Sequence, residues 1–266
     1  MNKYLPLLFS FMLILPLATG CADTLPNSKH EGNDAQKEQV ELTISAAASL
    51  QDALNEIKTK FEKDHSNIML TFNYGASGTL QTQISQGAPV DLFFSAAEDK
   101  FDQLMDKGLI DKDAGIDLVG NEIVLVVPKD STKEMNDFKD LTKADKISIG
   151  TPETVPAGLY AKETMENIKV WENVVDKIVF AKDVRQVLTY VETGNVDAGI
   201  VYKTDAKTSD KVKIVATAAE DTHTPIIYPV GIINKTKHIE EAQLFYDYLQ
   251  KKESLEILKK YGFKSL

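Results

Sequence analysis

The chain has 266 residues, with 30 lysines and arginines against 40 acidic residues, and a formal net charge of −10 at pH 7. An acidic balance of this size argues against nucleic acid as a partner, because phosphate backbones are bound by basic surfaces. The only cysteine is Cys21 and the only arginine is Arg185, which excludes an intramolecular disulfide, a cysteine metal cluster and a cluster of arginines that clamps an anion.

The first twenty residues have the features of a secretory signal peptide. Lys3 gives a short basic start, residues 5–17 are almost wholly apolar, and small residues at 18–20 lead to Cys21. An apolar run this short does not reach the roughly 20 residues that a membrane span needs. We therefore predict a signal peptide over residues 1–20.

Cys21 follows the small residues directly, in a pattern that resembles a lipobox, in which the thiol is acylated and becomes the mature N-terminus. Ala18 stands where the commonest lipobox has leucine, and an ordinary secretory signal with an incidental cysteine is the alternative. We expect a lipid-anchored, extracytoplasmic protein. Residues 22–40 are polar and have almost nothing to bury, so residues 21–40 are interpreted as the lipidated cysteine and a flexible tether.

From residue 41 onward, short apolar runs alternate with amphipathic segments. Strands are predicted at 42–46, 69–74, 91–95, 123–127, 147–150, 178–180, 198–202, 212–216 and 226–232. Helices are predicted at 50–61, 79–86, 98–107, 157–168, 184–193, 239–250 and 252–261. This alternation indicates an α/β protein with mainly parallel sheets flanked by helices.

Two sheets fit the length better than one, which predicts two lobes. The chain is expected to cross from the first lobe to the second at Gly120 and Asn121, and to return within residues 225–229. Lobe I is then predicted to comprise residues 41–119 and 229–266, and lobe II residues 120–228.

Enzyme motifs are nearly lacking. There is no Walker-type or Gly-x-Gly-x-x-Gly sequence, and the four histidines show no metal-ligand spacing. Residues 75–78 (Gly-Ala-Ser-Gly) only half resemble a nucleophile elbow, because Thr79 occupies the last position. We expect neither an enzyme nor a cofactor, and no direct cation site; a serine hydrolase remains a distant alternative.

A recurring element is a strand end followed by a small or hydroxyl residue and a helix start. Ser49, with Asp52 three residues on, has a capping-box pattern, and Ser77 opens the next helix. Such turns lie at the carboxyl edge of an open α/β sheet, where ligands bind and helix N-termini present unpaired N–H groups. Each residue also has a purely structural explanation, as a helix cap for the serines and as a core tyrosine for Tyr202.

At these positions the sequence resembles the molybdate-binding protein family (ModA type), the capture component of molybdate ABC importers. The resemblance rests on residues 46–50 (Ala-Ala-Ala-Ser-Leu), 76–80 (Ala-Ser-Gly-Thr-Leu), 87–93, 120–121, 152–162, 183–185 (Asp-Val-Arg), 199–202 (Gly-Ile-Val-Tyr), 228–230 (Tyr-Pro-Val), 245–249 and 261–263. It covers the chain from about residue 41 to the end. The second serine motif is serine-rich in many relatives, whereas here Ala76 and Gly78 flank Ser77.

The resemblance implies a type II periplasmic-binding-protein-like fold with two lobes that close on a ligand in the cleft between them. It implies that ligand-binding groups come from both lobes. These are Ser49 and Ser77 in lobe I, and the backbone N–H groups of Ala157 and Val184 and the phenol of Tyr202 in lobe II.

The expected ligand is molybdate, with tungstate as a second one, and the expected partner is the permease of an ABC importer. The protein itself is expected to be a monomer. A receptor of the same fold for sulfate or for another tetrahedral oxyanion is the main alternative.

Overall fold

The structure is a computed structural model that describes residues 38–111 and 114–266. The predicted signal peptide, the predicted lipidation site Cys21 and most of the predicted tether therefore lie outside the described residues. Within those ranges, no helix is both long enough and apolar enough to cross a membrane.

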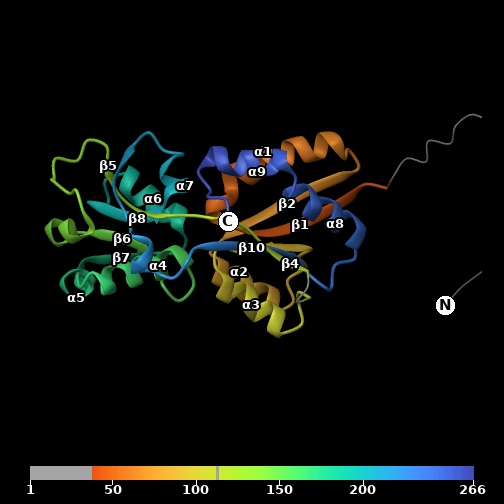
Figure 1. Ribbon diagram of the computed structural model, residues 1–266, viewed down its shortest axis with the longest axis horizontal. Coiled ribbons are helices and arrows are strands. Elements are labelled where there is room, and N and C mark those ends of the chain that lie inside the picture. The colour runs from red at the N-terminus through yellow and green to blue at the C-terminus, as the bar shows by residue number, and fades with distance from the viewer. Residues whose placement is uncertain (1–37, 112–113) are drawn as a thin grey trace, which may run out of the picture. The chain divides into compact units, whose positions relative to one another are not determined.

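The first sheet (sheet I) has five strands (Figure 1). In spatial order they are β2 (Ile68–Gly75), β1 (Val40–Ala47), β3 (Leu92–Phe94), β10 (Ile227–Ile232) and β4 (Gly115–Gly120). β1 is parallel to both neighbours, while β10 is antiparallel to β3 and to β4. Four of the strands therefore share one direction, and only β10 is reversed.

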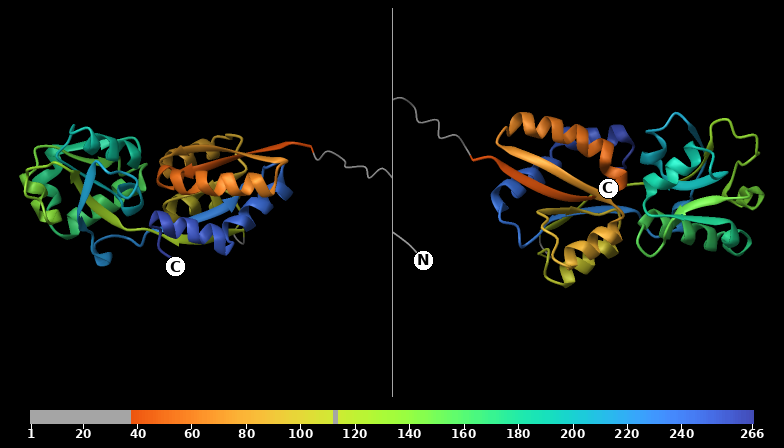
Figure 2. Two further views of the ribbon diagram at one scale, coloured as in Figure 1. Left: turned by 90° about the horizontal axis from the view of Figure 1, so that it is seen from above. Right: turned by 180° about the vertical axis from the view of Figure 1, so that it is seen from behind.

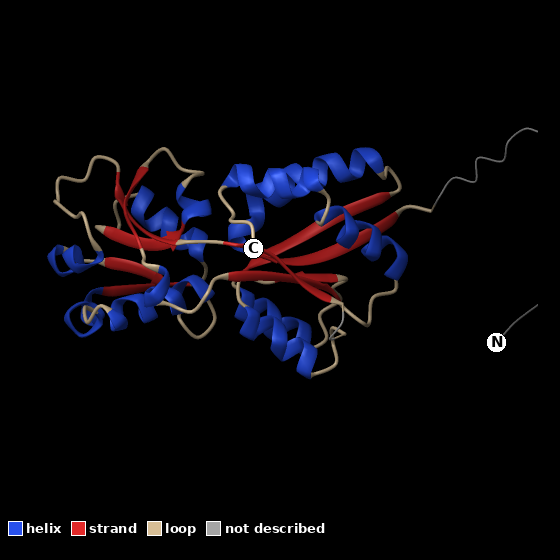
Figure 3. Cartoon of the chain, viewed as in Figure 1, coloured by secondary structure: helices blue, strands red, loops and turns tan. Residues whose placement is uncertain are grey.

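The second sheet (sheet II) repeats this plan (Figure 3). Its spatial order is β7 (Ile178–Ala181), β6 (Ile147–Gly150), β8 (Ala198–Tyr202), β5 (Ile123–Pro128) and β9 (Val212–Thr217). β6 is parallel to β7 and β8, and β5 is antiparallel to β8 and β9, so β5 is the one reversed strand. The prediction of mainly parallel sheets is confirmed.

Helices cover both faces of sheet I (Figures 1 and 2). One face carries α1 (Gln51–Asp64), α8 (Ile239–Leu249) and α9 (Lys252–Tyr261), and the other carries α2 (Ser77–Ser85) and α3 (Glu98–Asp106). Successive side chains of β3 point to opposite faces of the sheet. Leu92 and Phe94 join the core under α1, while Phe93 joins the core under α2 and α3. The predicted apolar face of the first helix, from Leu50 to Phe61, is fully buried.

Sheet II is covered by four helices and forms, with them, lobe II. They are α4 (Pro156–Asn167), α5 (Trp171–Val174), α6 (Val184–Glu192) and α7 (Lys203–Ala206). The buried residues of α6 are Val184, Val187, Leu188 and Val191, which is the spacing of one helical face. Short 3-10 segments complete the described chain: η1 (Ala48–Leu50), η2 (Phe138–Lys143), η3 (Val175–Lys177) and η4 (Glu220–Thr222).

The chain crosses between the sheets twice, and each crossing leads into a reversed strand. β5 follows β4 after Asn121 and Glu122, and β10 follows β9 after residues 218–226. Ile227 and Tyr228 already pair with β4, so β10 begins inside the stretch 225–229 where the return was expected. The C-terminal end comes back to lobe I, where Lys264 and Gly120 exchange backbone hydrogen bonds of 2.9 and 2.8 Å.

Candidate functional site

Ser49 lies between β1 and α1 and is buried. The alternative explanation for this serine, that it caps the following helix α1, is wrong. A 3-10 turn over Ala48–Leu50 delays the helix, the N-cap position falls on Leu50, and no side chain caps it. The Ser49 hydroxyl lies instead 2.9 Å from the hydroxyl of Tyr228 on β10. Ser49 is therefore held by the crossing strand rather than used to start its own helix.

Ser77 is the first residue of α2 and is completely buried. Its Oγ accepts a 2.9 Å hydrogen bond from the backbone N–H of Ala96, in the loop after β3. The next residue, Gly78, donates its N–H to the carbonyl of Thr154 in lobe II at 3.0 Å. The N-terminal end of α2 thus touches the other lobe.

Ala157 and Val184 are buried at the N-terminal ends of α4 and α6. Pro156 occupies the first position of α4, and the Asp183 side chain caps α6 by accepting the Gln186 N–H at 2.8 Å. The first turn of a helix has no intrahelical acceptors for its N–H groups. The N–H groups of Ala157 and Val184 are therefore suited to bind an anion.

Tyr202 ends β8 and is fully buried, as its apolar run indicated. Its hydroxyl donates to the carbonyl of Ala96 across the lobes, at the long distance of 3.4 Å. Burial raises the pKa of the Tyr202 phenol well above its usual value, so the group stays protonated and can donate.

The structure brings three of the five predicted residues together around the main chain of Ala96 and the side chain of Tyr228. Ser77 and Tyr202 both bond to the main chain of Ala96, one to its N–H and the other to its carbonyl. Ser49 joins them through Tyr228, whose ring lies 5.7 Å from that of Tyr202. The helix that begins at Val184 contacts η1, which holds Ser49, and Ala157 follows the loop that Gly78 touches.

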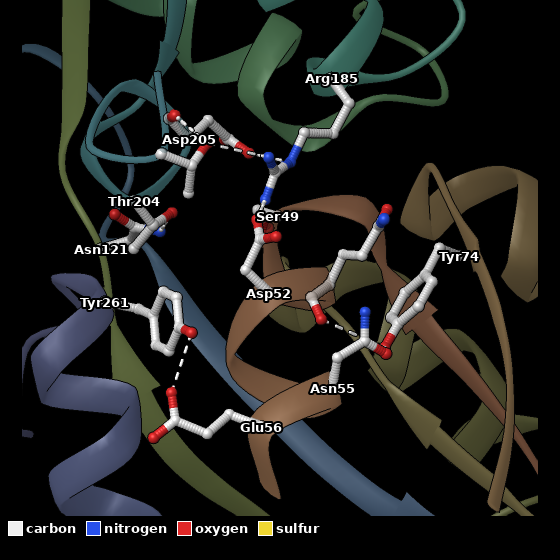
Figure 4. A network of polar contacts seen from close by, with 12 residues as sticks. Ser49, Asp52, Asn55, Glu56, Tyr74, Asn121, Arg185, Thr204, Asp205 and Tyr261 are labelled. Carbon is white, nitrogen blue, oxygen red and sulfur yellow. Dashed lines mark hydrogen bonds and ion pairs between the residues drawn. The ribbon is translucent and has the colours of Figure 1, made fainter. Parts of the chain in front are cut away.

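The single arginine is occupied by carboxylates, as Figure 4 shows. Arg185 forms an ion pair with Asp52 of lobe I, and its Nε lies 2.9 Å from Asp205 Oδ1, without the alignment of a hydrogen bond. Burial raises the pKa of Asp205 to about 7, and the Arg185 charge opposes that rise. Arg185 thus links α6 to α1 of the other lobe and has little positive charge left over for an anion.

Sequence reasoning did not identify Tyr228 and Asn121 as members of the site. Tyr228 is fully buried, and its hydroxyl receives a 3.1 Å hydrogen bond from Asn121 Nδ2. The sequence could have indicated them through their positions, because Asn121 and Tyr228 lie at the two places where the chain crosses between the sheets.

The described residues contain no group of three or more histidine, cysteine, aspartate or glutamate side chains that could hold a metal ion. His223 Nδ1 lies 2.8 Å from the carbonyl oxygen of its neighbour Thr224. Ser77 has a backbone N–H rather than a base beside it. The arrangement can donate hydrogen bonds to a small acceptor-rich ligand.

Comparison with known protein families gives a match over residues 42–264 to bacterial extracellular solute-binding proteins. The chain belongs to this family. The family consists of binding proteins rather than enzymes, which confirms the expectation of a non-enzymatic protein and removes the serine hydrolase alternative.

Three relatives are similar over most of their length. YvgL of Bacillus subtilis, provisionally named an ABC transporter substrate-binding lipoprotein, is 57% identical over 93% of each chain. The molybdate-binding protein ModA of Escherichia coli is 37% identical, covering 86% of this chain and 91% of its own.

The third is a solved structure, the substrate-binding domain of a provisionally assigned molybdenum ABC transporter from Clostridium difficile. It is 44% identical with a TM-score of 0.67, and the match covers 86% of this chain and all of that one. The resemblance drawn from the sequence and the two-lobed, binding-protein fold are both confirmed.

Proposed function

We propose that this protein captures molybdate outside the cytoplasm and delivers it to the permease of an ABC importer. The observation that carries the proposal is the set of neutral donors contributed by both lobes: the hydroxyls of Ser49, Ser77 and Tyr202 and the first-turn N–H groups of Ala157 and Val184. The names of the ModA relative and of the Clostridium difficile domain support the choice of ligand.

The donor set suits the chemistry of this anion. Molybdate is a fully deprotonated dianion at neutral pH, so it offers hydrogen-bond acceptors and no proton. A protonated phosphate would in addition need an acceptor such as a carboxylate, and none of the five groups supplies one. Tungstate presents the same oxygens in the same arrangement, so we infer that it binds as well, without a cofactor or a resident cation.

Sulfate is the second candidate ligand, because it too is a tetrahedral dianion without a proton. Neutral donors would satisfy it equally well, and only the size of the space between the lobes would separate the two anions. The close contact of Gly78 with Thr154 supports a fixed separation of the lobes in the closed state.

A thermal-shift panel with molybdate, tungstate, sulfate and phosphate tests the ligand. A ligand that binds only the folded protein raises its stability by RT ln(1 + [L]/Kd), which is about 2.7 kcal/mol at a hundredfold excess over Kd. We expect large and similar shifts with molybdate and tungstate, and small ones with sulfate and phosphate. A sulfate shift as large as that of molybdate would assign the protein to the sulfate-type receptors.

For the mechanism, we infer a hinge between lobe I (residues 41–119 and 229–266) and lobe II (residues 120–228), with a monomer as the working unit. Ser49 and Ser77 then belong to lobe I and the other three groups to lobe II, so a bound anion bridges the lobes. A ligand shifts such an equilibrium only through contacts that it makes better in the closed state.

We further infer that Cys21 is acylated after removal of residues 1–20 and anchors the protein to the membrane. Diacylation with a further chain holds firmly, whereas one acyl chain does so weakly. Cys21→Ser is therefore expected to release the mature protein from membranes into the medium or periplasm, with unchanged affinity for molybdate. Fractionation followed by mass spectrometry of the N-terminus measures this, and retention of the variant on membranes would contradict the anchor.

A further inference from the structure

A chain of buried polar side chains runs from the hinge to Ser49. Asn121, from the first crossing, donates through Nδ2 to Thr204 Oγ1 at 2.9 Å and to the Tyr228 hydroxyl at 3.1 Å. Tyr228, from the second crossing, lies 2.9 Å from Ser49 Oγ. All four side chains are at least 94% buried. Their polar atoms therefore form hydrogen bonds with one another rather than with bulk water. Figure 4 labels Ser49, Asn121 and Thr204.

The direction of this chain is set by a backbone group at its far end. The N–H of Glu122 can only donate, and it lies 2.9 Å from Asn121 Oδ1. Turning the amide over would place its NH₂ group against this N–H, so Nδ2 must face Thr204 and Tyr228 as a donor. The Tyr228 oxygen therefore receives a proton from Asn121.

The other neighbours of the Tyr228 hydroxyl are Ser49 Oγ, at 2.9 Å, and the hydroxyl of Tyr202. Besides burial, the hydrogen bond with Tyr228 raises the pKa of the Tyr202 phenol, as expected where Tyr202 donates to Tyr228, which directs the Tyr228 proton to Ser49 Oγ. With the anion bound, a proton on Ser49 has the anion's oxygens as acceptors. If Ser49 donated to Tyr228 instead, the phenolic proton would be buried without an acceptor, which costs more than a made hydrogen bond contributes. Ser49 Oγ thus accepts from Tyr228, and its own hydroxyl proton is left for a ligand. Burial raises the pKa of Tyr228 well above its usual value, so the phenol retains that proton.

The Ser77 hydroxyl is also an acceptor of a hydrogen bond from the protein, but from a different donor. Its Oγ accepts from the N–H of Ala96 at 2.9 Å, a donor that cannot reverse. Both serines of lobe I therefore accept from the protein and have their protons free. This matches an anion that carries acceptors only.

We propose that Tyr228 and Asn121 act as specificity-determining positioning residues: their hydrogen bonds orient the Ser49 hydroxyl as a donor and so favour a fully deprotonated oxyanion over a protonated one. The inference rests on the proposed function. Without the Tyr228 hydroxyl, the Ser49 side chain is free to rotate and to accept a proton from a ligand such as hydrogen phosphate.

The test is Tyr228→Phe, which keeps the ring and its packing against Tyr202 and Phe263. Molybdate affinity, measured by calorimetry, is expected to fall about 3- to 10-fold, the range of one neutral hydrogen bond. Phosphate affinity is expected not to fall in parallel, so that the preference for molybdate over phosphate decreases by a similar factor. Tyr248→Phe is the matched control, because it removes one hydroxyl from a buried tyrosine that bonds to Asp64 on α1 at 3.2 Å.

The outcomes separate the two claims. An unchanged molybdate-to-phosphate ratio in Tyr228→Phe, whether or not both affinities drop, overturns the orienting role and leaves molybdate binding intact. Absence of molybdate binding to the wild-type protein, measured in the same titration, contradicts the proposed function and this inference with it. A change of preference in Tyr248→Phe equal to that in Tyr228→Phe would also reject the inference, since it would trace the effect to a general loss of packing.

Discussion

Gly78→Ala is expected to weaken molybdate binding about 5- to 150-fold without destabilising the unliganded fold. A Cβ added at Gly78 would lie 2.8 Å from the carbonyl oxygen of Thr154 and 2.9 Å from its Cα. Both are backbone atoms of the other lobe and cannot rotate away, so the lobes must separate. Overpacking of this kind costs about 1–3 kcal/mol, and here the cost falls on the arrangement in which the two lobes touch.

The effect of Gly78→Ala on the stability of α2 itself is favourable, opposite to its effect on the contact between the lobes. In a helix, alanine is favoured over glycine by up to about 1 kcal/mol, so α2 itself is not weakened by the change. Calorimetric titration with molybdate, together with the unfolding midpoint of the unliganded protein, distinguishes the two effects. Wild-type affinity in Gly78→Ala would mean that the Gly78–Thr154 contact is not part of the state that binds the ligand.

Gly75→Ala is the matched control three residues earlier. Its added Cβ would meet only the flexible side chain of Leu80, at an ordinary 3.4 Å. Its affinity is expected to stay within about twofold of wild type, the usual range for a substitution without a structural conflict. A large loss in Gly75→Ala would attribute the effect to the whole segment rather than to contact between the lobes.

The sequence identified every strand with a strong apolar run but missed β4. Its residues Gly115–Gly120 include two glycines and an aspartate, and only Val119 and Gly120 are buried. β4 is an edge strand whose place depends on pairing with β10, more than 100 residues away in sequence. Propensity and periodicity are local quantities, so they could not reveal a strand that a distant partner stabilises.

The candidate site shows the same division between local and distant causes. The cap of α6 by Asp183 and the start of α4 at Pro156 depend on neighbours within one turn, so the sequence around each is enough to explain it. The partner of Ser49 is 179 residues away, and the capping pattern with Asp52 gave the wrong interpretation because Asp52 pairs with Arg185 instead. Long-range hydrogen bonds decide which hydroxyl is available to a ligand, and they become visible only once the chain is folded.

Among the proposed ligand groups, the Tyr202 hydroxyl is the one whose removal should change ligand affinity with the least change in the stability of the fold. This hydroxyl makes a 3.4 Å contact with the Ala96 carbonyl, which is long enough to contribute little, and shares a hydrogen bond with the Tyr228 hydroxyl. The ring of Tyr202 remains packed against Tyr228 after loss of the hydroxyl. Ser49, by contrast, also receives the Tyr228 proton, so its removal would leave a buried donor without an acceptor.

Tyr202→Phe is therefore expected to lower molybdate affinity by about 1.5–3 kcal/mol, the contribution of a hydrogen bond to a charged acceptor, or about 10- to 150-fold. The unfolding free energy without ligand should change by less than about 0.5 kcal/mol. Tungstate affinity should fall by the same factor, because both anions present the same oxygens to the phenol. Titration calorimetry and denaturant unfolding measure the three quantities, and a Tyr202→Phe protein that binds molybdate as tightly as wild type would exclude the phenol from the ligand shell and leave lobe II with backbone donors only.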